Sequence, residues 1–110
     1  PYWDMSDPRI TTPGQDLAAI PRDASAAAIT ASALYELARY VAPSEARAYT
    51  DYADRVVDSL YNSYRAPRHS TGGFLLLPSP GHPPAGSEID VPLNYADYYY
   101  LEALARRAGK

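Results

Sequence analysis

The longest apolar pattern along the chain covers residues 24–42, a stretch without glycine or proline. Apolar side chains recur there every three or four residues, which is the spacing of one helix face. They are Ala26, Ile29, Ala33, Leu37 and Val41. Small apolar residues occupy most of the other positions as well. The pattern predicts a helix that is buried on nearly all sides, and a chain of 110 residues can hardly supply the neighbours that such a helix needs.

Residues 45–64 predict a second helix of a different kind, because only one of its faces is apolar. The apolar face consists of Ala46, Tyr49, Ala53, Val56, Leu60 and Tyr64, and the opposite face carries Arg47, Asp51, Asp54, Arg55 and Asp58. We expect Pro43 to end the first helix and Ser44 to cap the second, which leaves almost no loop. The two helices should therefore form an antiparallel hairpin. Asp23 is the expected cap of the first helix, with Ser25 as the alternative.

Outside this hairpin the chain is mostly irregular, with one further helix. Prolines break residues 1–22 and the long connection 65–91, in which a short apolar run over 74–77 can pair as a strand. The third helix covers residues 93–108, and its apolar stripe consists of Leu93, Ala96, Tyr100, Leu104 and Ala108. We therefore predict an all-α fold with three main helices and a long irregular loop. The alternation of enclosed helices with a one-sided helix is typical of an α/α barrel.

Composition excludes several classes of function. The net charge of −3 gives no strong electrostatic footprint for nucleic acid or an anionic membrane, and no apolar run approaches the length of a membrane helix. Cysteine is absent, which excludes disulfides and thiolate metal sites, and the carboxylates and histidines lack metal-ligand spacing. Tyrosine is unusually frequent, with 11 copies against one Phe and one Trp. A side chain with an apolar ring and a polar tip suits half-buried surfaces and clefts that face sugars.

The N-terminus indicates a larger parent. The chain starts with Pro1 instead of methionine, and no basic segment followed by an apolar segment marks a signal peptide. We expect that the chain was cut from a longer polypeptide, although a mature secreted protein can also start in this way. The sequence indicates no cellular compartment.

Four segments of the chain resemble the C-terminal part of one enzyme family. They are residues 1–4 (Pro-Tyr-Trp-Asp), 22–29 (Arg-Asp-Ala-Ser-Ala-Ala-Ala-Ile), 81–93 (Gly-His-Pro-Pro-Ala-Gly-Ser-Glu-Ile-Asp-Val-Pro-Leu) and 95–104 (Tyr-Ala-Asp-Tyr-Tyr-Tyr-Leu-Glu-Ala-Leu). Their order and spacing are similar to those of the unsaturated glucuronyl hydrolases, glycoside hydrolase family 88. One departure is Pro83, which stands where a basic residue is expected and puts a cationic substrate contact from this loop in doubt.

The resemblance implies a fold, a reaction and a partner. Residues 1–110 would be the C-terminal fragment of a single (α/α)6-barrel catalytic domain, with the remainder of the barrel as partner. The family removes 4,5-unsaturated uronic acid from oligosaccharides that lyases leave, and it needs no cofactor. A carboxylic acid protonates C4 of the enol ether, water adds at C5, and the hemiketal opens to release the partner sugar. The key aspartates lie in earlier helices of the family, so the catalytic residues of this chain remain unknown.

Four residues are candidates for binding the unsaturated oligosaccharide. If the helices over 24–42 and 93–108 are inner helices of a barrel, their N-terminal ends lie on the same rim. Trp3 can then stack on a sugar or anchor the loop, and Arg22 can bind the uronate carboxylate or form a structural ion pair. His82 can hydrogen-bond the substrate, carry a proton or be merely structural, and Tyr95 can face the cleft.

Two other functions fit the same residues. A non-catalytic helical module could use the tyrosine-rich loop to bind a glycan or a protein, and it would fold without further polypeptide. A related α/α-barrel enzyme, such as an unsaturated rhamnogalacturonyl hydrolase, would differ in its substrate.

Overall fold

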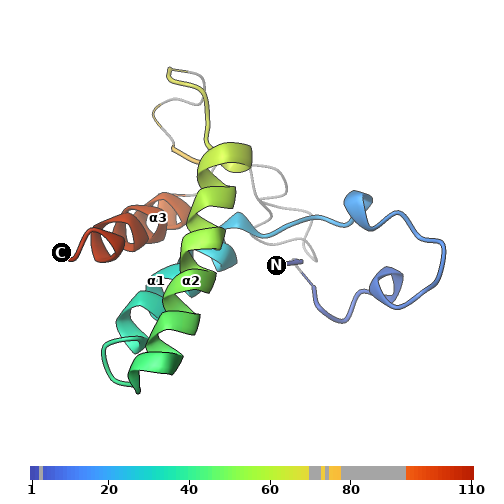
Figure 1. Ribbon diagram of the computed structural model, residues 1–110. Coiled ribbons are helices and arrows are strands. Elements are labelled where there is room, and N and C mark those ends of the chain that lie inside the picture. Colours follow the sequence, from blue (N-terminus) through green and yellow to red (C-terminus); the bar gives the residue numbers. More distant parts are fainter. Residues whose placement is uncertain (3, 70–72, 74, 78–93) are drawn as a thin grey trace.

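The computed structural model describes residues 1–2, 4–69, 73, 75–77 and 94–110, and within them the chain is helical (Figure 1). The α-helices are α1 (Ala24–Leu37), α2 (Pro43–Ser59) and α3 (Asn94–Arg107), and a π-helical turn, Leu60–Tyr64, continues α2. Two 3-10 turns, Pro8–Ile10 and Leu17–Ala19, interrupt the N-terminal segment. The described residues form isolated β-bridges and no strand, which confirms the all-α class.

Helix α1 begins as predicted and ends earlier than predicted. The Asp23 carboxylate accepts a hydrogen bond from the Ala26 amide at 2.9 Å, so Asp23 is the cap. The chain leaves the α-helical path after Leu37, where the amides of Arg39 and Tyr40 bond three residues back. Ala42 is extended, with ψ at 151°, because a residue before proline avoids the helical conformation. The predicted end at residue 42 is therefore wrong by five residues.

Helix α2 starts one residue before the expected cap. Pro43 is its first residue, which its fixed φ and missing amide hydrogen allow at this position. Ala42 takes the N-cap position without any side-chain hydrogen bond, so the prediction that Ser44 caps the helix is wrong. The short connection still turns the chain back, and α1 and α2 form the predicted antiparallel hairpin (Figure 1).

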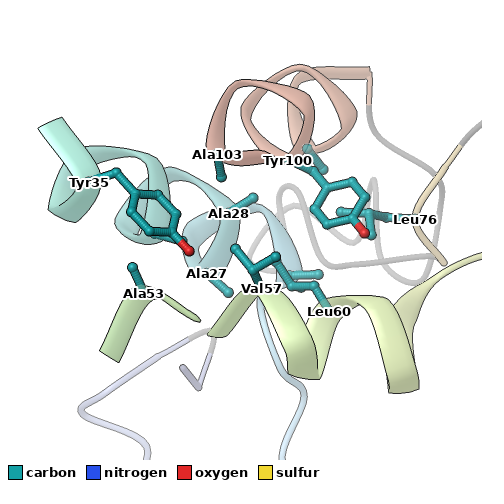
Figure 2. Packing of buried hydrophobic residues seen from close by; sticks show 12 residues of the cluster. Ala27, Ala28, Tyr35, Ala53, Val57, Leu60, Leu76, Tyr100 and Ala103 are labelled. Carbon is teal, nitrogen blue, oxygen red and sulfur yellow. The ribbon is translucent and has the colours of Figure 1, made fainter. Parts of the chain in front are cut away.

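Helix α1 lies at the centre of the packing and contacts both α2 and α3. Figure 1 shows α1 and α3 starting near the middle of the view and running in the same general direction, whereas α2 runs the opposite way. The core between them is built mainly from small side chains and a few larger ones (Figure 2). Its most deeply buried members are Ala28, Ala31, Ala53, Val57, Leu60, Leu76 and Ala103.

The predicted stripe of α1 points away from this core. Ile29 and Leu37 are 40% and 43% exposed, and Ala33 is also exposed. The face that packs in the chain is instead formed by Ala24, Ser25, Ala27, Ala28, Ala31, Ser32 and Tyr35. Apolar residues thus lie on most sides of the helix, as expected, but the described residues cover only one side of it.

Hydrogen bonds join residues 75–77 to the start of α3. The Asp97 carboxylate accepts hydrogen bonds from the amides of Leu75 and Leu76, at 2.8 and 3.0 Å. Leu76 forms an isolated bridge with Arg65 and is 1% exposed. The strand predicted over 74–77 is therefore only a bridge at Leu76 in the part that the structure describes.

Candidate functional site

The parallel course of α1 and α3 places two of the four candidate residues at the same end of the molecule. Arg22 lies two residues before α1, and Tyr95 lies in the first turn of α3. Trp3 and His82 lie outside the described residues. The site that can be described is therefore the rim formed by the N-terminal ends of α1 and α3.

Arg22 is held at this rim by the N-terminal segment of the chain. Its backbone forms an isolated bridge with Tyr2, and the neighbouring amide of Asp23 donates to the Pro1 carbonyl at 3.1 Å. The Arg22 guanidinium carbon lies 3.9 Å above the centre of the Tyr2 ring, a cation–π contact. Stacking leaves the edges of the guanidinium plane open for a carboxylate fork. Among the described residues, Arg22 makes this aromatic contact and none of the ion pairs.

A groove of about 580 Å³ opens beside Arg22, between the start of α1 and the end of α2. Residues that can bond or stack on a sugar line it: Arg22, Thr30, Tyr52, Arg55, Ser59 and Tyr64. The Arg55 guanidinium lies 5.5 Å from the centre of the Tyr52 ring. The groove is also lined by Asp23, but two guanidinium groups outnumber this carboxylate, so the groove with its hydroxyls suits an acidic saccharide; its volume lies in the range of small-ligand sites.

Tyr95 lies on the side of α3 that carries Glu102, and it is not among the residues that line the groove beside Arg22. It precedes Glu102 by seven residues, which is two helical turns, so the two side chains share one face. Glu102 contacts Ser32 of α1, which fixes the direction of that face. Tyr95 is 39% exposed. The rim therefore presents a tyrosine on α3 and a guanidinium beside α1.

A polar cluster joins α1 to α3 further from the rim, and sequence reasoning did not find it. The Ser32 hydroxyl donates to a Glu102 carboxylate oxygen, and Arg106 Nη1 donates to the Ser32 carbonyl and Oγ at 2.9 and 3.0 Å. Arg106 also lies 3.3 Å from Glu102. Two signals were present: the i,i+4 pair of Glu102 and Arg106, and a serine within an alanine-rich helix.

A second cluster connects all three helices at the far end of α3. The Tyr35 hydroxyl donates to Asp54 at 2.5 Å, and Arg107 binds Asp54 and Asp58 at 3.2 and 2.8 Å. Burial raises the pKa of Tyr35, and the hydrogen bond to the Asp54 carboxylate raises it further. This cluster lies away from the rim. Its hydrogen bond and ion pairs therefore serve to hold the three helices together.

Among the residues that the structure describes, two carboxyl groups have shifted pKa values, and both shift downward. The hydrogen bond from the Arg9 guanidinium lowers the pKa of Asp7, and hydrogen bonds from Tyr40 and Arg39 lower that of Glu36. An acid that protonates a double bond near neutral pH needs a raised pKa, so these two groups do not suit that task.

The described residues contain no cluster of three histidine, aspartate or glutamate side chains that could hold a metal ion. Every helix in this part of the chain is too short or too polar to span a lipid bilayer.

Comparison with known proteins gives one consistent result. No protein-family model matches the chain. An unsaturated glucuronyl hydrolase of Formosa agariphila is 44% identical over 108 residues, which are 97% of this chain. The crystal structure of an unsaturated glucuronyl hydrolase specific for heparin is 45% identical and covers 84% of the chain with a TM-score of 0.78. A variant of the Streptococcus agalactiae enzyme, complexed with dGlcA-GalNAc6S, is 30% identical over 84% of the chain with a TM-score of 0.75.

The match is confined to one part of these proteins. The chain spans 24% of the Formosa agariphila relative, 24% of the heparin-specific enzyme and 25% of the Streptococcus agalactiae enzyme. Its helices superimpose on a segment of their folds, and the identity extends along nearly the whole chain. The resemblance to the unsaturated glucuronyl hydrolases is therefore confirmed in sequence and in structure, over a segment about a quarter as long as those enzymes.

Proposed function

We propose that this chain forms part of an enzyme that removes 4,5-unsaturated uronic acid from oligosaccharides produced by polysaccharide lyases. The observation that carries the proposal is the 44% identity to an unsaturated glucuronyl hydrolase along 97% of the chain. The names of the relatives favour this substrate over that of an unsaturated rhamnogalacturonyl hydrolase. Fragments of glycosaminoglycans, such as unsaturated heparin disaccharides, are the proposed substrate class.

In the proposed reaction, an acid protonates C4, water adds at C5, and the resulting hemiketal opens and releases the partner sugar. Residues 1–110 bind the sugar in this scheme, and another part of the barrel supplies the acid. The lowered pKa values of Asp7 and Glu36 make these two carboxyls unsuitable as that acid, because both lose their protons more readily than usual.

Arg22 is the proposed partner of the uronate carboxylate. Its guanidinium is stacked on Tyr2 and can donate two parallel hydrogen bonds, which is the geometry that a carboxylate accepts best. Tyr95 is proposed to hydrogen-bond a sugar hydroxyl from the other side of the rim. Trp3 and His82 are proposed to complete the sugar-binding set, because they belong to the segments that carry the family resemblance.

The remainder of the barrel is the proposed partner of the outward apolar surface. Large side chains on α1 and α3 stay exposed: Ile29 at 40%, Leu37 at 43%, Tyr98 at 61% and Leu101 at 53%. Exposed large apolar side chains in such number are typical of a surface that another part of a protein covers. We therefore propose that residues 1–110 are the C-terminal part of a single α/α-barrel catalytic domain, whose other helices cover this surface.

A chimera tests the proposal directly. This chain would replace the matching segment of the Formosa agariphila relative, and the product would be assayed with unsaturated disaccharides from heparin and chondroitin. We expect loss of the ultraviolet absorbance of the enol ether as the double bond is hydrated. A folded chimera that leaves this absorbance unchanged would contradict the proposed activity.

Arg22→Lys in the same chimera tests the binding role, because lysine keeps the charge but loses the fork. We expect KM to rise about tenfold with little change in kcat, as for the loss of one charge-assisted hydrogen bond. Arg47→Lys on the exposed face of α2 is the matched control, and it should leave KM unchanged. Equal KM values for the two variants would show that Arg22 does not bind the substrate.

A further inference from the structure

The buried residues that α1 and α3 contribute to the core are mostly alanine. Ala28 and Ala103 are fully buried, and Ala24 and Ala96 are at most 3% exposed. Alanine faces let two helices approach closely, but they form shallow ridges and grooves. Apolar packing alone therefore resists sliding of one helix along the other only weakly.

The polar cluster at Ser32 supplies the missing constraint. Ser32 is 1% exposed and lies within the apolar interface, where an unpaired hydroxyl is costly. Its hydroxyl donates to Glu102, and its Oγ and carbonyl both accept from Arg106. A slide of one residue moves these atoms by about 1.5 Å, which is enough to break the hydrogen bonds.

The orientation of Arg106 is fixed by two carboxylates. Its guanidinium lies 3.3 Å from Glu102, on the preceding turn of α3, and 3.9 Å from Glu36 of α1. Glu36 also accepts a hydrogen bond from Tyr40 at 2.9 Å, which holds it in place. Carboxylates of both helices thus hold the Arg106 guanidinium in the position from which it hydrogen-bonds to Ser32.

We infer that Ser32, Glu102 and Arg106 are positioning residues that set the register of α1 against α3, and thereby the separation of Arg22 and Tyr95 at the sugar-binding rim. The inference rests on the proposed function. Because the helices run in the same direction, any slide at the cluster is transmitted along both helices to their N-terminal ends. A register that is not fixed would spoil the simultaneous contact of both rim residues with one sugar.

The test uses the active chimera with Ser32→Ala and Glu102→Ala. Each variant should raise KM about five- to tenfold, while kcat per folded enzyme stays within about twofold, because uniform binding is lost. Glu102→Gln keeps an oxygen that accepts from Ser32 and should retain a nearly normal KM. Ser44→Ala, at an exposed position of α2, is the matched control.

Each outcome decides the inference. A cluster that only stabilises the fold would lower the melting temperature and the yield of active enzyme, with KM unchanged, and this result would overturn the inference. If Ser32→Ala does not fold, the comparison of Glu102→Ala with Glu102→Gln decides, and equal KM values would refute the positioning role. An inactive unmodified chimera would overturn the proposed function and this inference together, whereas an active chimera with unmoved KM values would overturn this inference alone.

Discussion

Helices α1 and α2 show how differently an apolar pattern can be used. In α2 the predicted stripe lies against the core, with Ala53 fully buried and Leu60 2% exposed. In α1 the predicted stripe faces outward, with Ile29 and Leu37 at 40% and 43% exposure. The charged face of α2 fixes its rotation, because charges avoid burial. Helix α1 has no such face, so its contacts with α2 and α3 decide which side is covered.

This difference between α1 and α2 also indicates a role for the outward face of α1. An amphipathic helix such as α2 needs only one partner surface, whereas α1 has apolar residues on most of its sides and is covered on one side only. The uncovered side is where we propose that other helices of the barrel pack. The following predictions test this contrast, from the largest expected effect to the smallest.

Leu60→Ala removes a large side chain from the buried stripe at the end of α2. The free energy of unfolding of the chain should fall by about 3 kcal/mol, since the lost burial and the cavity both destabilise. Leu37→Ala on the exposed side of α1 is the control, and it should cost less than about 0.5 kcal/mol. Urea denaturation followed by circular dichroism measures both. Similar losses for the two variants would show that α1 and α2 do not differ as described.

Ile29→Ser tests whether the outward face of α1 is buried by other helices in the chimera. In the chain alone the change should cost less than about 1 kcal/mol, because 40% of Ile29 is already exposed to water. In the chimera it should cost about 2 kcal/mol, because a buried apolar side chain is then replaced by a hydroxyl. Thermal unfolding of both proteins gives the comparison, and an equally small effect in both would oppose the proposed packing.

Tyr35→Phe probes the link between α1 and α2 near the far end of α3. Loss of the hydrogen bond to Asp54 should cost about 1 kcal/mol near neutral pH. The pKa of Tyr35 is raised above its ordinary value of 10.0, so the stabilisation by its neutral hydroxyl is complete below that pH and is lost as the pH rises further. Unfolding curves between pH 8 and 12, a range chosen around this ordinary value, should show a steeper decline for the unmodified chain than for the variant. Parallel declines would contradict the assigned shift.

The smallest effects are expected at the N-caps of α1 and α2. Asp23 caps α1 with its side chain, whereas Ala42 at the start of α2 makes no such bond. Asp23→Ala should therefore destabilise the chain by about 1 kcal/mol, and Ala42→Ser should stabilise it by about 0.5 kcal/mol. Asp51→Ala, on the exposed face of α2, controls for loss of charge. Chemical denaturation separates the three variants, and an Asp23→Ala variant as stable as the control would rule out the cap.

Local signals predicted the existence of the three helices, the Asp23 cap and the hairpin, because each depends on a few neighbouring residues. Signals that depend on tertiary contact were missed. The rotation of α1 could not be predicted, since alanine occurs on all its faces, and Pro43 was read as an ending although it can also begin a helix. The Ser32 cluster joins residues 70 positions apart, and no sequence period brings such residues together.

The same distinction holds for the rim. Helix direction placed Arg22 and Tyr95 at one end, because parallel packed helices share their ends. The stack of Arg22 on Tyr2 was not predicted, since it depends on how the N-terminal segment returns to the start of α1. The groove with Tyr52 and Arg55 was also not predicted, because Arg55 belongs to the charged face of α2 and Tyr52 to neither predicted face.

The most direct measurement compares the accessibility of two alanines on α1, since the natural chain contains no cysteine. Ala33→Cys lies on the exposed face, and Ala31→Cys lies in the core at 0% exposure. In the chain alone, a maleimide should label the Ala33→Cys variant rapidly and the Ala31→Cys variant slowly. In the chimera we predict slow labelling at both positions, because other helices of the barrel cover the outward face. Rapid labelling of Ala33→Cys in a folded chimera would contradict the central claim.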